Sequence, residues 1–333
     1  MITVDGYTFV GSYAELCEKF IAYKRSLGYS YNPRTIRHIR YFNEYLNTAQ
    51  KSDPGDLILT KEVVENFTAI KDGEQPATTL HRETTIRQFA LFMNKLGMPA
   101  YIAPISRKRY SSFTPYIFSK EQILALLNVV DNLKYDFRSP HYQHVYPFII
   151  RLLYCCGLRL GEALNLRIEN IDFDERVIRI EQAKFNNSRL VPMSDSLFSA
   201  LEEYMRLVGY SPADEGYLFR TKKNRKYAPN SIFSRYKDFL RMAGMPRLPS
   251  GGLPRLHDLR HTFSVHALES LIAQGIDVYS GLPYLMNYLG HRQMRHTEYY
   301  LRLTSAAYSG IDNALAPLYT DLFPKEVVYD EAT

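Results

Sequence analysis

A proline-containing stretch near residue 100 predicts that the chain folds as two domains. Pro99, Pro104 and Pro115 fall within residues 98–117. Proline lacks the N–H of a helix and holds the preceding residue in extended geometry, so no helix is expected to run through this stretch. A chain of 333 residues is long enough for two domains that each bury a core. We therefore expect four segments: a helical domain at 1–102, a basic interdomain linker at 103–117, a second domain at 118–319 and a tail at 320–333.

The first hundred residues carry clear signals for helix ends. Ser12 followed by Glu15 has the pattern of a capping box, in which a hydroxyl and a carboxylate each satisfy a free backbone N–H. The helix that follows is expected to end at Gly28, because glycine commonly terminates helices. Apolar periodicity predicts further helices that start at Pro33, start at Thr60 and span residues 84–96. These residues are therefore expected to form a small helical bundle.

The second domain is predicted to be mainly helical with one small antiparallel sheet. Ser119 and Gln122 form another capping box. Two short apolar runs, 177–180 and 189–192, predict a β-hairpin whose polar tip contains Lys184. The expected helices are one over 145–166, one from Ser194 to Gly209, one after the basic loop 222–226, one started by Pro283, and others to about residue 320.

Composition favours a protein of the cell interior that acts on a polyanion. The net charge is +6, which favours a polyanionic partner. The three cysteines have no metal-site spacing and cannot form a disulfide framework. The N-terminus lacks a signal-peptide pattern, and the longest apolar stretch, residues 147–158, is too short to span a bilayer. A cytoplasmic location and no membrane partner are therefore expected.

Four short blocks carry residues suited to phosphate chemistry. They are Gly157-Leu158-Arg159-Leu160-Gly161-Glu162, His257-Asp258-Leu259-Arg260-His261-Thr262-Phe263, Leu289-Gly290-His291, and Tyr300. Metal-free cleavage of a DNA phosphodiester needs a nucleophile, a proton donor for the leaving 5′-oxygen, and cations that stabilise the pentacoordinate phosphorus. Arginine suits the last task because its planar, permanently charged fork matches two phosphate oxygens. A tyrosine ester of phosphate conserves the bond energy for rejoining, while fixed charges and positioning supply the catalysis.

From about Pro147 to Leu303 the chain resembles the catalytic domain of the phage integrase, or tyrosine recombinase, family. The resemblance implies a mainly α fold, with a helical core-binding domain followed by a mostly α catalytic domain that holds a small antiparallel sheet. It implies a site-specific DNA recombinase that cleaves and rejoins strands through a 3′-phosphotyrosyl intermediate and needs neither cofactor nor metal. Integration, excision or resolution of a mobile element is the expected role.

The resemblance also implies a role for each residue of the blocks. Arg159 and Arg260 would hold the non-bridging oxygens of the scissile phosphate, and His291 would hydrogen-bond the same phosphate. His257 would handle the proton of the nucleophile. Tyr300, nine residues after His291, would attack the phosphorus. Lys184 would protonate the leaving 5′-hydroxyl.

Several residues allow other interpretations. Lys222 or Lys223 could replace Lys184 as the proton donor, and Tyr299 adjoins the expected nucleophile. Neighbours on a helix point about 100° apart, so only one of the two tyrosines can face the phosphate. His257 and His261 are four residues apart, a spacing that could hold zinc, although the glutamate of the metalloprotease pattern is replaced by Asp258.

Three residues of the blocks also have structural interpretations. Arg159 could be a structural arginine that caps the preceding helix. His261 could serve packing. Glu162 is expected to be a buried partner that orients an arginine.

Basic residues that lie outside the apolar helix faces are the candidate DNA contacts, since each phosphate contact releases counterions. They are Arg34, Arg37, Arg40, Arg82, Arg87, Arg107, Lys108, Arg109, Lys222, Lys223 and Arg225.

The resemblance further implies a double-stranded recombination site bound by two protomers and a synapse of four. Accessory DNA-bending or directionality factors are further partners that it allows. The tail at 320–333 has four carboxylates and one lysine, a net charge of −3. Its apolar residues suggest that it docks on a neighbouring protomer, and a frayed terminus is the alternative.

Three other functions fit parts of the sequence. A type IB topoisomerase-like enzyme would use similar chemistry but relax DNA as a monomer. A non-catalytic DNA-binding relative would tolerate Tyr300→Phe. A zinc hydrolase would use His257 and His261, and metal analysis of the purified protein would test it.

Overall fold

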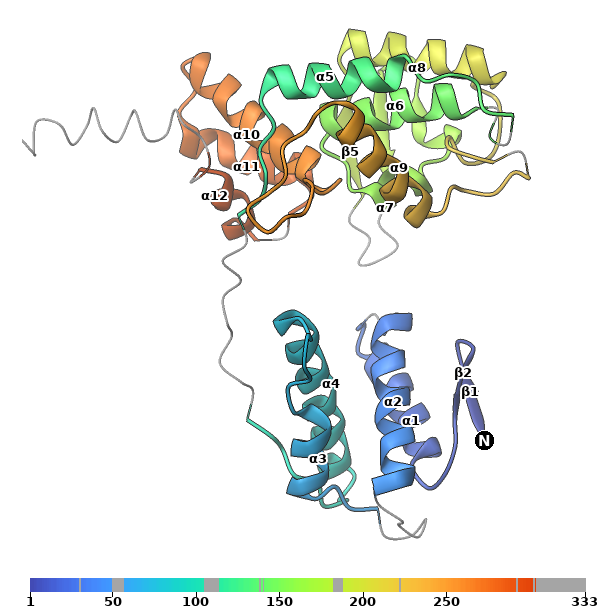
Figure 1. Cartoon of the computed structure of the whole chain (residues 1–333), viewed down its shortest axis with the longest axis vertical. Helices are drawn as coiled ribbons and strands as arrows, with labels where there is room; N and C mark the ends of the chain where they lie inside the picture. Colours follow the sequence, from blue (N-terminus) through green and yellow to red (C-terminus); the bar gives the residue numbers. More distant parts are fainter. Residues whose placement is uncertain are drawn as a thin grey trace, which may run out of the picture. The chain divides into compact units, whose positions relative to one another are not determined.

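The chain forms two compact units, Met1–Phe113 and Thr114–Thr333, in the computed structural model (Figure 1). Each unit has its own hydrophobic core. The expected fold class is confirmed, because both units are mainly helical and carry small antiparallel sheets. The structure describes residues 1–29, 31–49, 57–104, 114–137, 139, 141–181, 188–221, 223–291, 293–301 and 303.

Unit 1 is a helical bundle with an N-terminal hairpin. Its strands pair antiparallel, with Ile2 opposite Phe9. Its elements are β1 (Ile2–Val4), β2 (Tyr7–Phe9), α1 (Ala14–Ser26), α2 (Pro33–Ala49), α3 (Lys61–Thr68) and α4 (Pro76–Lys95).

Aromatic rings fill the centre of unit 1, where α2 packs against the other three helices. The Phe89 ring of α4 meets Phe20 of α1 edge-on, with ring centroids 5.2 Å apart. It meets Phe42 of α2 in the same way at 5.9 Å. Edge-to-face contacts of this kind stabilise a core beyond the area that they bury. The apolar periodicity of the sequence is thus satisfied within the unit.

Two helix starts in unit 1 differ from the prediction. Helix α1 begins at Ala14 with Tyr13 as its N-cap, so the expected Ser12 capping box is wrong. Helix α4 begins at Pro76, eight residues before Thr84, because proline at the first helical position has the required φ and loses no hydrogen bond there. The start at Thr60 is confirmed, since its hydroxyl accepts from the Val63 N–H.

Unit 2 combines helices with a three-stranded antiparallel sheet of order β3-β4-β5. Its elements are α5 (Lys120–Asp131), α6 (Tyr142–Cys155), α7 (Leu160–Asn165), the 3₁₀ helix η1 (Ile168–Asn170), β3 (Ile171–Asp172), β4 (Val177–Ile180), β5 (Arg189–Pro192), α8 (Asp195–Val208), α9 (Pro229–Met242), α10 (Asp258–Ala273), α11 (Val278–Leu289) and α12 (Arg295–Leu301).

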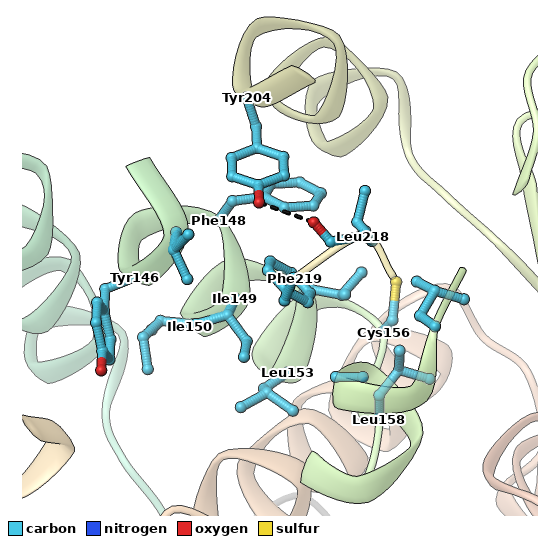
Figure 2. Packing of buried hydrophobic residues seen from close by; sticks show 14 of the residues in the cluster. Tyr146, Phe148, Ile149, Ile150, Leu153, Cys156, Leu158, Tyr204, Leu218 and Phe219 are labelled. Atoms are coloured by element: carbon cyan, nitrogen blue, oxygen red, sulfur yellow. Dashed lines mark hydrogen bonds between the residues drawn. The ribbon is translucent and has the colours of Figure 1, made fainter. Parts of the chain in front are cut away.

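Helix α6 lies at the centre of unit 2 and packs against α5, α8 and α10. Figure 2 shows its buried face, where the Phe148 ring stacks on Tyr204 of α8 with centroids 5.0 Å apart. The buried Tyr204 hydroxyl donates to the Leu218 carbonyl at 2.9 Å, so it carries no unsatisfied polar atom into the core. The core thereby fixes the end of α6, which is followed directly by the sequence block 157–162.

The helix expected over 145–166 is two helices with a break between them. Gly157 has φ +56°, a left-handed conformation that suits glycine, and it separates α6 from α7. Cys156 and Leu158 on either side of it are buried in the core (Figure 2). The prediction missed this break because the apolar pattern continues across the glycine.

Other predictions in unit 2 have mixed outcomes. The Ser119–Gln122 capping box, the helix from Ser194 to Gly209 and the paired strands β4 and β5 are confirmed. Pro283 does not start a helix: it lies inside α11, which begins after the N-cap residue Asp277.

Among the described residues, no helix is long and apolar enough to cross a membrane.

Candidate active site

Four elements of unit 2 bring the four sequence blocks together. Arg159 is the N-cap of α7, Arg260 lies in the first turn of α10, His291 follows α11, and Tyr300 belongs to α12. Helix α10 contacts α6, α11 and α12, so it is the element on which the others converge. Blocks that are far apart in sequence therefore form one cluster.

Arg260 is the buried centre of this cluster, with 2% of its surface exposed. Its Nη1 donates to the Gly157 carbonyl and its Nη2 to the Leu289 carbonyl, both at 2.6 Å. The two main-chain contacts fix the guanidinium plane and connect the block at 157 to the block at 289. Burial and the charge of Arg159 lower the pKa of Arg260 to about 10, so it stays charged at neutral pH.

His291 is held in one tautomer by two neighbours. Its Nε2 lies 3.1 Å from Arg260 Nη2, and because arginine only donates, Nε2 must accept. Its Nδ1 therefore carries the proton and donates to Thr297 Oγ1 at 2.9 Å. Burial and the charges of Arg260 and Arg159 lower the pKa of His291 to about 3, which keeps the ring neutral.

The end of α11 explains why glycine precedes this histidine. Gly290 has φ +66°, and the N–H of His291 bonds the Met286 carbonyl at 3.0 Å, as in a Schellman motif. A side chain at Gly290 would also meet Arg189, since an added Cβ would lie 3.0 Å from its Nη1. The Leu289-Gly290-His291 block thus ends the helix and places the imidazole at Arg260.

Glu162 orients two arginines, as the sequence suggested for one. Its Oε1 lies 2.7 Å from Arg159 Nη1, and its Oε2 accepts the Arg159 backbone N–H at 2.9 Å. It also binds the guanidinium of Arg189, with 2.7 Å between Oε2 and Nη2. Burial alone would raise the pKa of Glu162, but Arg189 and Arg159 outweigh it and lower the value to about 2.

Arg189 is a site residue that the sequence reasoning missed. Only 9% of its side chain is exposed, and its Nε donates to the Tyr288 carbonyl at 2.8 Å. It shares a face of β5 with Val191, which is fully buried. The signal was therefore present: strand alternation places Arg189 inward, where a charge requires a partner.

Tyr300 is the tyrosine whose hydroxyl faces the cluster. It is 2% exposed, and its Oη lies 3.1 Å from Nδ1 of His261. Its ring is nearly parallel to that of His291, with centroids 6.1 Å apart. Burial raises the pKa of Tyr300, while the Ser264 hydroxyl and the charges of Arg260 and Arg159 oppose that rise.

The ring of His261 lies between His257 and Tyr300, whereas the sequence resemblance gave His257 the proton of the nucleophile. His257 is the exposed N-cap residue of α10, and its ring meets the His261 ring edge-on at 4.8 Å. Partial desolvation and the charges of Arg260 and Arg255 lower the pKa of His257 to about 4. The described residues hold no group of three histidine, cysteine or acidic side chains that could bind a metal.

The residue expected to act as the proton donor is not described. Lys184 lies in the segment 182–187, and the substitute Lys222 is likewise outside the described residues. The other substitute, Lys223, is exposed in the connection between α8 and α9.

The expected DNA contacts of unit 1 occupy different environments. Arg82 is 4% exposed and binds Glu74 and the Ala69 carbonyl, so its assignment to DNA is wrong: it neutralises a buried carboxylate and completes the end of α3. Arg87 donates to the Ala103 carbonyl, and Arg40 pairs with Glu44.

Arg37 is exposed on α2, beside a hollow that Tyr41 and Lys71 also line. Arg34 lies on the same helix. In unit 2, Arg225 is exposed in the same connection as Lys223, whereas Arg107, Lys108 and Arg109 are outside the described residues.

Comparison with known proteins shows the family of the chain. The profile of the phage integrase family matches residues 117–306. This chain belongs to the phage integrase family. It is a tyrosine-type site-specific DNA recombinase, and none of the alternative functions considered from sequence is favoured.

Relatives of similar length carry corresponding names. The recombinase is 28% identical over 301 residues to the putative integrase/recombinase y4rB of Sinorhizobium fredii, covering 88% of this chain and 93% of that one. It is 27% identical over 290 residues to a tyrosine recombinase of Pseudothermotoga lettingae, covering 80% and 91%.

Solved structures share the fold. The Tn1549 transposon integrase in complex with transposon right-end DNA has a TM-score of 0.61 at 16% identity, over 90% of this chain and 99% of that one. The XerH recombinase bound to its difH substrate before cleavage has a TM-score of 0.60 at 18% identity, over 80% and 74%.

Proposed function

We propose that this recombinase cuts DNA by attack of the Tyr300 hydroxyl on a phosphodiester, which forms a 3′-phosphotyrosyl bond and frees a 5′-hydroxyl. The observation that carries the proposal is the meeting of Tyr300, Arg260 and His291 in one cluster. Rejoining is the reverse reaction, in which a 5′-hydroxyl of a second strand attacks the phosphotyrosine. The energy of the original bond is kept, so no nucleotide cofactor is required.

The charge of the cluster suits a phosphate. Three guanidinium groups, those of Arg159, Arg189 and Arg260, surround the single carboxylate of Glu162, an excess of two positive charges. The side chain of Arg159 is 39% exposed, so its fork can reach a phosphate from outside. Arg260 adds a fixed charge behind it. A buried, preformed positive field of this kind stabilises the extra negative charge of a pentacoordinate phosphorus.

The leaving oxygen needs a proton, and we assign its donation to Lys184. The bonded pair β4–β5 extends to Ile180 and Arg189, so Lys184 belongs to the connection between them. Arg189, the first residue of β5, binds the carboxylate of Glu162, and the same carboxylate binds Arg159. Arg189, which follows the connection that carries Lys184, is therefore tied through Glu162 to the residue assigned to the phosphate.

The substrate in this proposal is a double-stranded recombination site bound by two protomers, with four protomers in the synapse. The complexes of Tn1549 integrase with transposon DNA and of XerH with difH support DNA as the ligand. Integration, excision or resolution of a mobile element is the corresponding role, with DNA-bending or directionality factors as further partners. We also propose that the acidic tail at 320–333, which lies outside the described residues, docks on a neighbouring protomer. Normal assembly on DNA of a chain ending at residue 318 would disprove that docking.

Nicked duplexes that trap the covalent intermediate test the chemistry. Duplexes from the sequence that flanks the gene are first selected for specific binding, and are then incubated with wild type, Tyr300→Phe and Tyr299→Phe in the presence of a metal chelator. We expect a denaturation-resistant protein–DNA adduct with wild type and Tyr299→Phe and none with Tyr300→Phe. Loss with Tyr299→Phe alone would move the nucleophile by one residue. Specific binding without any adduct would overturn the proposed chemistry.

A further inference from the structure

We infer that His261 is the catalytic residue that accepts the proton of the Tyr300 hydroxyl during attack. The inference rests on the proposed function, since it requires Tyr300 to be the nucleophile. It differs from the role that the sequence resemblance gave to His257.

Geometry favours His261. Its Nδ1 lies 3.1 Å from Tyr300 Oη, the atom that must lose its proton. This distance is within hydrogen-bond reach, the first requirement of a general base. His257 meets Tyr300 only through the intervening imidazole, because its ring packs on the His261 ring at 4.8 Å.

The helix explains why the second histidine is the closer one. His257, His261 and Ser264 are spaced four and three residues apart, so they lie along one face of the first two turns of α10. Helix α12 packs on this helix and carries Tyr300. His257 lies at the exposed end of the row, and His261 lies one turn further in, opposite the tyrosine hydroxyl.

The charged surroundings keep His261 unprotonated before DNA binds. Burial and the neighbouring His257, Arg255, Arg260 and His291 lower the pKa of His261 to about 3. A neutral imidazole has one ring nitrogen with a free lone pair, which can accept from Tyr300. A phosphate bound at Arg159 and Arg260 would offset the positive charges and raise the proton affinity of His261. The base would therefore strengthen when the scissile phosphate is in place.

The step balances within the cluster and the substrate. The Tyr300 Oη–H bond breaks as the Oη–phosphorus bond forms, and the proton moves to His261 Nδ1. The bond between phosphorus and the 5′-oxygen breaks, and the 5′-oxygen takes a proton from the donor assigned to Lys184. On rejoining, the tyrosine oxygen leaves and recovers its proton from His261.

Single-turnover adduct formation on the nicked duplexes tests the inference with His261→Asn, His261→Ala and His257→Ala. The asparagine can still accept a hydrogen bond from Tyr300 but has no useful basicity, so it separates proton transfer from positioning. We expect both His261 variants to lose at least about 100-fold in rate, in the range of general base catalysis, and His257→Ala to lose less than about tenfold. Near-wild-type rates with His261→Asn, or a larger loss with His257→Ala than with His261→Ala, would overturn the inference.

Two controls separate the possible failures. Thermal melting and specific DNA binding of His261→Asn should match wild type, which shows that the rate loss is not a loss of fold. A substrate with sulfur in place of the bridging 5′-oxygen needs no proton donor, so it should leave the His261 defect unchanged. Restoration of the rate by this substrate would overturn the assignment, since His261 would then serve the leaving group. Absence of an adduct with wild type, despite specific binding, would reject the proposed function itself.

Discussion

Glu162 and Arg189 form a two-point ion pair, with Arg189 Nη2 2.7 Å from Oε2 and Nη1 3.1 Å from Oε1 of the carboxylate. The pair joins β5 to α7 across 27 residues of sequence. Because the same carboxylate binds Arg159, the orientation of an arginine assigned to the phosphate depends on β5 as well as on α7.

Replacement of Glu162 by glutamine should destabilise unit 2 by about 3 kcal/mol, because it leaves the charge of Arg189 buried without a counter-charge. It should also slow adduct formation, since Arg159 loses its fixed orientation. Urea unfolding, followed by hydrogen exchange in peptides of unit 2, measures the first effect. A matched control is Glu203→Gln, which removes an exposed pair with Arg206 and should leave the unfolding midpoint unchanged. Equal midpoints for the two variants would contradict the structural role of Glu162.

The stability of unit 2 should fall on acidification in two stages. The folded-state pKa of both His261 and His291 is lowered to about 3, so below about pH 6.5 the unfolded chain takes up protons that the folded chain does not. Stability is then complete above pH 6.5 and declines by about 1 kcal/mol per pH unit for each histidine. Below about pH 4.5 the decline steepens, because Glu162 then takes up a proton in the unfolded chain. In the folded chain its pKa is lowered to about 2, so it stays ionised there.

Urea midpoints measured from pH 8 to pH 4 test this dependence. His261→Asn should have a shallower slope between pH 6.5 and 4 than wild type. Parallel curves for the two proteins would show that His261 titrates alike in the folded and unfolded chains.

Gly157 should not tolerate alanine, whereas Gly161 should. At Gly157 an added Cβ would lie 2.4 Å from the Phe263 ring, and φ is +56°. Left-handed backbone and overpacking together should cost about 3 kcal/mol and displace Arg159. At Gly161, in α7, no atom lies within 4 Å of an added Cβ, and alanine should be neutral or stabilising by up to about 1 kcal/mol. Thermal melting of the two single variants measures both effects, and a stable Gly157→Ala protein would refute the steric argument.

Lys184→Ala should lose about 100-fold or more in adduct formation on ordinary DNA, as expected for a missing general acid. A bridging 5′-sulfur should restore the rate, because a thiolate leaves without a proton. Lys223→Ala serves as the matched control and should stay within about threefold of wild type on both substrates. If sulfur rescues a Lys222 or Lys223 variant in place of Lys184→Ala, the proton donor belongs to the loop at 222–226.

Much of the fold follows from local signals in the sequence. The caps at Thr60, Ser119 and Ser194 are formed by side chains that bond backbone atoms three residues away, so they are readable from a few letters. The break at Gly157 was not readable in this way. It depends on Phe263, which packs against the glycine from a helix about a hundred residues later.

The candidate site likewise has a part that the sequence predicts and a part that depends on how the helices pack. Arg159, Arg260, His291 and Tyr300 could be predicted as a set because their spacing matches a family. Their hydrogen-bond partners could not, since the contact of His261 with Tyr300 and that of Thr297 with His291 depend on how α10, α11 and α12 pack. A polar residue on the inward face of a strand, as at Arg189, was a usable signal that the family pattern did not point to.

The hydrogen bonds from Arg260 to two main-chain carbonyls determine at which stage of synthesis the enzyme becomes able to cut DNA. They reach residues 103 positions earlier and 29 positions later, so neither a nascent chain nor a proteolytic fragment that lacks either segment can hold the guanidinium in place. Tyr300 is added later still, nine residues after His291. The cluster is therefore not assembled in an incompletely synthesised protein, and the capacity to cut is acquired only when the whole catalytic unit has folded.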